Sequence, residues 1–244
     1  MIDYSIIIPA YNEELLLPAT IRKLRAGMDS LSEMKGEILV VDNNSSDSTA
    51  DVARKNGARV VFEPINQISR ARNAGAREAF GRFLLFVDAD TLVPKELLQE
   101  VLHGLAFEEF GAGGSTLRFE RLEGKGFLLS ELPNLWNYVS RGLHLAAGSF
   151  LFVRKDAFEA VGGFSKRVYA GEEIFLSNAL KRWCRKNKKL FRIMARTPVL
   201  TSSRKLQWFS PLKLLSVILL PLVCPLVLYS KRFCSFWYVR PKAN

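Results

Sequence analysis

The chain has 244 residues, of which 48% are apolar and 24% are charged. This composition excludes a disordered or low-complexity protein, and the length suffices for one large α/β domain. The net charge of +11 is uneven, because residues 181–244 contain 15 of the 35 basic residues and none of the 24 acidic ones. Such a basic tail indicates an anionic partner, and both nucleic acid and anionic lipid are of that kind.

The three cysteines, Cys184, Cys224 and Cys234, show no C-x-x-C spacing and form an odd, sparse set. They predict neither a disulfide framework nor a zinc site, and they favour a reducing cytosolic setting. Residues 1–4 lead directly into an apolar strand, without the basic and long apolar regions of a secretory signal peptide. We therefore expect no signal peptide.

Short apolar segments alternate with helical patterns in the first 87 residues. Strands are predicted at residues 5–9, 37–41, 59–62 and 83–87, and helices at 13–28, 49–56 and 69–80. Continuously apolar strands that alternate with helices indicate an α/β fold, a mostly parallel sheet covered by helices on both faces.

The pattern becomes looser after residue 92. Helices are predicted at residues 94–107, 127–141, 154–161 and 172–186, and strands at 112–119 and 146–153. Residues 192–195 and 198–201 indicate one or two last strands. Gly162 and Gly163 interrupt the chain before the last of these helices.

Polar clusters follow three of the predicted strands, each at the point where the strand ends. They are Pro9-Ala-Tyr-Asn-Glu13, Asp42-Asn-Asn44 and Asp88-Ala-Asp90. In a parallel sheet the carboxyl ends of the strands meet at one edge, and ligands bind beyond that edge. The sequence therefore predicts one binding site formed by the three clusters together.

The tripeptide Asp88-Ala89-Asp90 offers two carboxylates to a hard divalent cation, which prefers oxygen ligands. Such a cation bridges phosphate oxygens and neutralises a diphosphate leaving group. Aspartate also ends strands and begins turns, so the tripeptide alone leaves a purely structural role open.

Four motifs in this order resemble the family 2 glycosyltransferases of the GT-A fold. They are Ile6-Ile-Ile-Pro-Ala-Tyr-Asn-Glu13, Val40-Val-Asp-Asn-Asn-Ser-Ser-Asp-Ser-Thr49, Ala71-Arg-Asn-Ala-Gly75 and Phe86-Val-Asp-Ala-Asp90. The resemblance covers about residues 4–200 and implies a Rossmann-like GT-A domain of bacterial type. It also implies a nucleotide diphospho-sugar donor, a hydroxyl acceptor and a divalent metal, Mn²⁺ or Mg²⁺.

The resemblance assigns the nucleotide-sugar site residue by residue. The implied set is Pro9, Ala10, Tyr11, Glu13, Asp42, Arg72, Asn73, Asp88, Ala89, Gly148 and Arg204. Within it the first loop embraces base and ribose, Asp42 bonds the base, and Asp90 ligates the metal beside Asp88. The alternatives are that Asp42 and Asp47 only cap the next helix, and that Arg72 is a solvated helix residue.

Gly171-Glu-Glu173 opens a predicted helix, and the resemblance places the acidic pair of the family there. The second member of that pair is usually aspartate and serves as general base, so Glu173 departs by one methylene. A carboxylate there takes the proton of the acceptor hydroxyl, and attack opposite the leaving diphosphate inverts the anomeric centre. Either Glu172 or Glu173 could be the base. The alternative to a catalytic role is that both acids only stabilise the N-terminus of the helix, where negative charge is favoured.

Two further segments match the family less specifically. Ala147-Gly-Ser149 stands where the family packs backbone against donor sugar and acceptor, although a tight strand crossing also needs small residues. Arg204 and Lys205 belong to a late basic loop that resembles one closing over the diphosphate, where a cation stabilises the leaving group. The alternative is that both belong to a general basic surface.

Residues 214–230 contain no charged side chain and lie between basic residues. A spanning helix needs about 20 apolar residues, and this run is shorter and holds Pro221 and Pro225. We therefore expect an interfacial or re-entrant segment on an anionic membrane, at its inner cytoplasmic face, rather than a nucleic-acid partner. An apolar arm packed on this domain or on a second subunit is the alternative. Membrane contact would suit a lipid-linked acceptor.

The sequence thus predicts a GT-A catalytic domain at residues 1–207 and an apolar, basic extension at 208–244. The expected activity is inverting, metal-assisted sugar transfer. A nucleotidyltransferase is the enzymatic alternative, but the first loop lacks the glycine-rich, basic phosphate loop expected of one. A non-catalytic sugar-nucleotide or lipid-binding protein is the other alternative, and it does not explain why Asp90 and the Glu172–Glu173 pair are both present.

Overall fold

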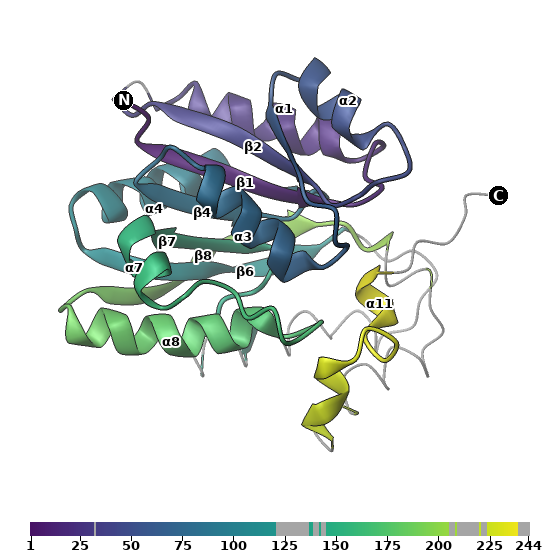
Figure 1. Ribbon diagram of the computed structural model, residues 1–244. Helices are drawn as coiled ribbons and strands as arrows, with labels where there is room; N and C mark the ends of the chain where they lie inside the picture. The colour runs from purple at the N-terminus through teal and green to yellow at the C-terminus, as the bar shows by residue number, and fades with distance from the viewer. Residues whose placement is uncertain are drawn as a thin grey trace.

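The computed structural model describes residues 1–31, 33–120, 137–138, 142, 145–204, 208, 220 and 224–238. In these parts of the chain eight strands form one sheet in the order β3-β2-β1-β4-β7-β6-β8-β5 (Figure 1). Their bounds are Tyr4–Ala10 (β1), Gly36–Asp42 (β2), Arg59–Phe62 (β3), Phe83–Val87 (β4), Thr91–Leu92 (β5), Phe110–Phe119 (β6), Phe150–Arg154 (β7) and Leu190–Thr201 (β8).

The first four strands in spatial order, β3, β2, β1 and β4, are parallel to one another. Strand β7 is antiparallel to both β4 and β6, while β6 and β8 are parallel. The predicted α/β fold with a mostly parallel sheet is confirmed. The carboxyl ends of β1, β2 and β4 lie at one edge, where the three polar clusters follow.

Helices cover both faces of the sheet. They are α1 (Leu17–Met28), α2 (Thr49–Lys55), α3 (Ile68–Glu78), α4 (Lys95–Ala106), α7 (Lys155–Ala160) and α8 (Glu172–Lys186). Alternate side chains of β1 point to opposite faces, as the period of a strand requires. Ile6 and Ile8 pack in one core cluster with α1 and α4, whereas Ile7 packs in a second with α3, α7 and α8.

The later strands settle one expectation that was left open and add one strand that was not predicted. The strands expected at 192–195 and 198–201 form the single strand β8, because residues 195–198 bulge opposite Thr116 and so accommodate Pro198. Strand β5 was not predicted, and its two residues pair with the end of β8. The helix expected at 127–141 lies almost entirely outside the described residues.

Of the extension predicted from residue 208, the structure describes a short 3₁₀-helix, η1 (Pro225–Tyr229), and one helical turn, α11 (Ser235–Tyr238). In Figure 1 this segment lies beside the end of α8 that carries Glu172. Among the described residues no helix combines the length and apolar character needed to cross a membrane. The boundary between residues 207 and 208 stays a prediction.

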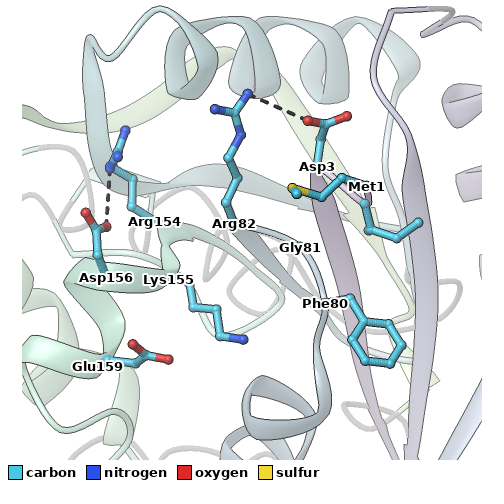
Figure 2. Close-up of a pocket in the computed structure, with 10 residues that line it drawn as sticks. Met1, Asp3, Phe80, Gly81, Arg82, Arg154, Lys155, Asp156 and Glu159 are labelled. Atoms are coloured by element: carbon cyan, nitrogen blue, oxygen red, sulfur yellow. Dashed lines mark hydrogen bonds and ion pairs between the residues drawn. The ribbon is translucent and has the colours of Figure 1, made fainter.

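A cavity of about 660 Å³ lies at the amino ends of β1 and β4, at the edge opposite the polar clusters (Figure 2). Its charged groups pair with one another: Arg82 Nη2 lies 3.7 Å from an Asp3 oxygen, and Arg154 Nε lies 3.3 Å from Asp156. Lys155 donates to the carbonyl of Ala79. These groups satisfy one another, so the carboxyl edge is the better place to look for chemistry.

Candidate active site

The loop after β1 and the loop after β2 are joined side by side. The amide of Glu13 donates to Thr49 Oγ1 at 2.8 Å, and the amide of Ser46 donates to Asn12 Oδ1 at 2.8 Å. Asn12 has a φ of 54°, in the left-handed region where asparagine is favoured. Tyr11 therefore belongs to a loop that the residues around Ser46 hold in place, whereas Pro9 and Ala10, which were expected in this loop, form the end of β1.

Asp42 ends β2 in register with Ala10 of β1 and is only 8% exposed. Its Oδ1 accepts a hydrogen bond from the amide of Ser45 at 3.0 Å, which stabilises the turn after the strand. At the start of α2 it is Asp47, not Asp42, that accepts the amide hydrogen bond of Thr49. The capping role left open for both aspartates thus belongs to Asp47.

Arg72 joins the parts of the site. Helix α3 begins near the carboxyl ends of the strands, which directs this side chain of its second turn to the polar edge. Its Nη1 donates to Glu172 Oε1 at 2.9 Å, and its Nη2 donates to Asp88 Oδ1 at 3.0 Å and to the carbonyl of Gly148 at 2.8 Å. The side chain is 4% exposed, so the alternative of a solvated Arg72 is wrong.

The charges around Arg72 set its protonation. Burial lowers the pKa of Arg72, but the negative charges of Asp88, Glu172 and Glu173 outweigh burial and raise it. The guanidinium therefore stays protonated and favours the ionised form of Glu172, its buried partner.

Glu172 and Glu173 begin α8 directly after Gly171, whose φ of +72° suits glycine. Glu172 is buried against Arg72, whereas Glu173 is partly exposed. Burial, together with the charge of Glu172, raises the pKa of Glu173 to about 7, against the opposing effect of Arg72. Burial also raises the pKa of Glu172, and Arg72 opposes that shift through a direct ion pair.

Gly148 lies between Arg72 and the second glutamate. A Cβ at this position would lie 3.2 Å from Arg72 Nη2 and 3.7 Å from the carboxyl carbon of Glu173. Glycine there allows the backbone to approach both groups closely. A position so near the acid pair suits the contact with sugar or acceptor that the family resemblance implies.

The backbone of Asp88-Ala89-Asp90 is held by its neighbours. Ser202 donates its amide to the carbonyl of Asp90 at 3.1 Å, and Thr20 Oγ1 donates to the carbonyl of Ala89 at 2.8 Å. The Asp88 side chain is 29% exposed and Asp90 as a residue is 8% exposed. The backbone of this turn is therefore held in place by Thr20 and Ser202.

Arg204 reaches the first loop from the end of the domain. Its Nη2 donates to Glu13 Oε2 at 2.5 Å, and its guanidinium carbon lies 4.9 Å from the ring centroid of Trp208. The structure thus brings Arg204 to the loop after β1, which contains Glu13. Lys205, the other cation considered, lies outside the described residues.

Asn73 binds the backbone of a neighbouring segment. Its Nδ2 donates to the carbonyl of Phe164 at 2.8 Å, and its Oδ1 accepts from the amide of Phe164 at 3.0 Å. This paired contact fixes the chain at Phe164, ahead of Glu172, while the nucleotide contact expected of Asn73 stays a prediction.

Ser149 was considered from the sequence only as part of Ala147-Gly-Ser149, for its backbone and not for its hydroxyl group. Within the described parts of the chain its buried Oγ has no hydrogen-bond partner, and its carbonyl accepts from the amide of Asp88 at 3.2 Å. A buried hydroxyl of this kind beside the acidic turn is suited to a ligand. The run of small residues before β7 is the signal that could have indicated it.

Comparison with known proteins identifies the family. Residues 5–162, more than half of the chain, match the family model described as Glycosyl transferase family 2. The chain belongs to glycosyl transferase family 2. This membership favours a glycosyltransferase domain over the nucleotidyltransferase considered above.

Curated relatives match parts of this glycosyltransferase domain. Glycosyltransferase AglE of Haloferax volcanii is 27% identical over 180 residues, which cover 70% of this chain and 58% of AglE. Dolichol-phosphate mannosyltransferase of Saccharomyces cerevisiae is 33% identical over 118 residues, 46% of this chain and 44% of that protein. An uncharacterized glycosyltransferase of Mycobacterium tuberculosis is 40% identical over 86 residues, 35% of this chain and 36% of its own length. The chain thus spans between about a third and three fifths of these relatives.

Solved structures share the GT-A fold of this domain. TarS of S. aureus, residues 1–349, superposes with a TM-score of 0.61 at 20% identity, covering 88% of this chain and 65% of that one. Mannosyltransferase PcManGT from Pyrobaculum calidifontis, in complex with GDP-Man and Mn²⁺, superposes with a TM-score of 0.61 at 21% identity. This match covers 82% of this chain and 56% of PcManGT. Glucosyl-3-phosphoglycerate synthase from Mycobacterium tuberculosis, in complex with Mn²⁺, UDP and glucosyl-3-phosphoglycerate, superposes with a TM-score of 0.62 at 17% identity. This match covers 98% of this chain and 81% of the synthase.

Proposed function

We propose that this domain transfers a sugar from a nucleotide diphospho-sugar to a hydroxyl acceptor, with inversion of the anomeric centre. The observation that carries the proposal is the position of Arg72, which binds Asp88 on one side and Glu172 on the other. This contact brings a metal-type carboxylate turn and an acidic pair to the same edge of the sheet. One substrate can reach both there.

The acidic turn fits a hard divalent cation. Asp88 and Asp90 supply carboxylate oxygens, and Arg72 holds the Asp88 side chain in place through a hydrogen bond to its Oδ1. Among the described residues no three His, Cys, Asp or Glu side chains come together as a metal cage. Asp88 and Asp90 would be the protein groups that hold the cation, since Mg²⁺ and Mn²⁺ accept few protein ligands beside phosphate oxygens. When bound, the cation neutralises charge on the leaving diphosphate.

Glu173 is the proposed general base. It is partly exposed and can meet an acceptor, whereas Glu172 is occupied by Arg72. The acceptor oxygen attacks the anomeric carbon while its proton passes to the Glu173 carboxylate. The bond from that carbon to the diphosphate oxygen breaks, and its electron pair leaves with the nucleoside diphosphate. Attack from the opposite face inverts the centre.

The remaining residues are proposed to bind and orient the donor. The nucleotide is surrounded by the end of β1, the loop after it and three further side chains, namely Pro9, Ala10, Tyr11, Glu13, Asp42, Asn73 and Ala89. Gly148 allows the sugar to approach. Arg204 is placed at this loop by Glu13 and adds positive charge for the diphosphate.

A donor screen tests the activity. Purified protein is incubated with uridine and guanosine diphospho-sugars, with Mn²⁺ present or chelated, and released nucleoside diphosphate is measured. We expect metal-dependent release from one donor, lowered by about 10²–10³-fold in Asp90→Ala, because the developing charge loses its stabilisation. Asp51→Ala, at an exposed aspartate of α2, is the matched control and should match the wild type. Equal rates for Asp90→Ala and wild type would refute the metal assignment.

We also propose that the extension binds the cytoplasmic face of an anionic membrane. Within residues 224–238, Leu226 is 74% exposed, Tyr229 50% and Phe233 57%, next to the exposed bases Lys231 and Arg232. Apolar and aromatic side chains beside basic ones suit the headgroup region. The absence of acidic residues from 181 onward adds attraction to anionic lipid. A lipid-linked acceptor would then lie close to the site.

Vesicle flotation tests the membrane contact. The protein should float with vesicles of phosphatidylcholine and phosphatidylglycerol, less so with phosphatidylcholine alone, and less at high salt. The double variant Leu226→Asp, Phe233→Asp should float several-fold less, because charge is costly in the bilayer interface. Leu190→Asp, at an exposed position of β8, is the control. If the double variant floats as well as Leu190→Asp, the membrane contact is wrong, and the apolar side chains of residues 224–238 would pack against protein instead.

A further inference from the structure

The segment 224–238 packs directly against the chain that precedes the acidic pair. Cys234 and Tyr238 form a small buried cluster with Ala170, and Leu228 and Tyr169 pack at its border. Figure 1 shows this segment next to the beginning of α8. The contact therefore lies at the end of α8 that carries the proposed base.

Tyr169 has both of its peptide groups bound by this segment. Its amide donates to the carbonyl of Leu228 at 2.7 Å, and its carbonyl accepts from Tyr238 Oη at 2.9 Å. The rings of Tyr169 and Tyr238 also meet edge to face, with centroids 5.9 Å apart. These contacts fix the backbone three residues before Glu172.

The other side of the same loop is held by α3. Gln67, the residue before that helix, donates from Nε2 to the carbonyls of Lys166 at 2.9 Å and Val168 at 3.0 Å. The loop is thus clamped between Gln67 and the C-terminal segment. Gly171 follows, and a Cβ there would lie 3.9 Å from the Leu228 side chain.

The C-terminal segment also lies within electrostatic reach of the acidic pair. Burial raises the pKa of Tyr238, and the negative charge of Glu172 raises it further. The pKa of Cys234 is raised by the same two causes in the same order. The charge of Glu172 is therefore felt by both buried side chains of the segment, in keeping with its packing against Tyr169 and Ala170.

We propose that residues 224–238 act as a brace that positions Glu172 and Glu173, and that Tyr238 is a positioning residue for sugar transfer. This inference rests on the proposed function. Without the brace the loop before Gly171 relaxes, and the start of α8 loses its alignment with Arg72 and the acceptor. Donor binding is unaffected, because the loops after β1 and β2 are held by each other. The exposed face of the same segment carries Leu226, Tyr229 and Phe233, so the proposed membrane contact and the brace share one element.

Hydrogen exchange on the full chain tests the brace without relying on activity. Tyr238→Ala should raise the exchange rate of residues 168–174 at least tenfold and leave residues 10–14 unchanged, and Tyr238→Phe should fall between this variant and wild type. Tyr138→Ala, at a tyrosine that is 80% exposed and lies outside the segment 224–238, is the control and should behave as wild type. An unchanged exchange rate at residues 168–174 would show that Tyr238 does not hold this loop. Faster exchange over the whole chain would show that Tyr238 stabilises the domain in general and not this loop in particular.

Kinetics then test the link to transfer. We expect kcat to fall about threefold to tenfold in Tyr238→Phe, as the loss of one hydrogen bond allows, and further in Tyr238→Ala, with KM for the donor unchanged. Unchanged kcat, or an equal loss of donor affinity, overturns the positioning role. If the wild type itself transfers from none of the donors, the proposed function fails, and the exchange measurement still decides whether the brace exists.

Discussion

Glu173→Gln is expected to lower the rate of sugar transfer by about 10²–10⁴-fold, the usual contribution of a general base. Glutamine has nearly the same shape but cannot accept the proton of the acceptor hydroxyl. Because Glu173 lies next to Gly148 and not in the nucleotide loops, the affinity for nucleoside diphosphate should stay within about twofold of wild type. Initial rates and a binding titration of the nucleoside diphosphate measure the two effects separately.

The pH dependence of the wild type follows from the same residue. A base must be ionised to act, and the pKa of Glu173 is raised to about 7 by burial and by the charge of Glu172. The rate should therefore be level above this pH and fall about tenfold per unit below it, as the carboxylate takes up a proton. The residual rate of Glu173→Gln should lack this step.

Two outcomes would count against Glu173 as the base. One is a Glu173→Gln rate within about threefold of wild type, and the other is loss of the same magnitude in Glu159→Gln. Glu159 is an exposed glutamate of α7 beside the cavity at the amino ends of the strands, so it serves as the matched control. If Glu172→Gln alone abolishes transfer without loss of stability, the role of base passes to Glu172.

Arg72→Met is expected to lower the free energy of unfolding by about 3–5 kcal/mol, the usual result of removing one partner of a buried ion pair. The variant leaves Glu172 buried without its counter-charge and removes the donor to the Gly148 carbonyl. Asp88, more exposed, loses its partner at smaller cost. Chemical denaturation at neutral pH measures the difference.

Arg54→Met is the matched control for this experiment. Arg54 pairs with Asp51 on α2, where the two side chains are 60% and 71% exposed, so its loss should cost about 0–1 kcal/mol. Combining Arg72→Met with Glu172→Gln should recover part of the stability, because the uncompensated charge is removed. A loss under about 1 kcal/mol for Arg72→Met, equal to that of Arg54→Met, would contradict the central position given to Arg72.

Much of the fold follows from local patterns. The strands at 59–62 and 83–87 and the helix at 172–186 were predicted with their observed bounds, because apolar runs, capping residues and glycines mark them. Strand β5 escaped prediction because its two residues become a strand only by pairing with β8. The sequence left open whether the two ends of β8 belong to one strand, because Pro198 cannot donate a ladder hydrogen bond. The bulge that accommodates Pro198 depends on the partner strand, β6, and is not visible in the sequence.

The site was predicted in its parts but not in its connections. Each cluster stands at a strand end, and that position is visible in the sequence. The pairing of Arg72 with Glu172, or of Asn73 with Phe164, joins positions about 100 and 91 residues apart. Such pairs depend on the order of strands and on which helix lies against which face. The docking of Tyr238 on Tyr169 was not predicted for the same reason.

These long separations also determine when the site can form. Glu13 meets Arg204 across 191 residues, and Arg72 meets Glu172 across 100. During synthesis the N-terminal strands emerge first and can begin to pair, but neither ion pair can close until residues beyond 172 and 204 have left the ribosome. Closing such large loops slows folding. Arg72 and Glu13 therefore remain without these partners through most of translation, and the two ion pairs close only late in folding.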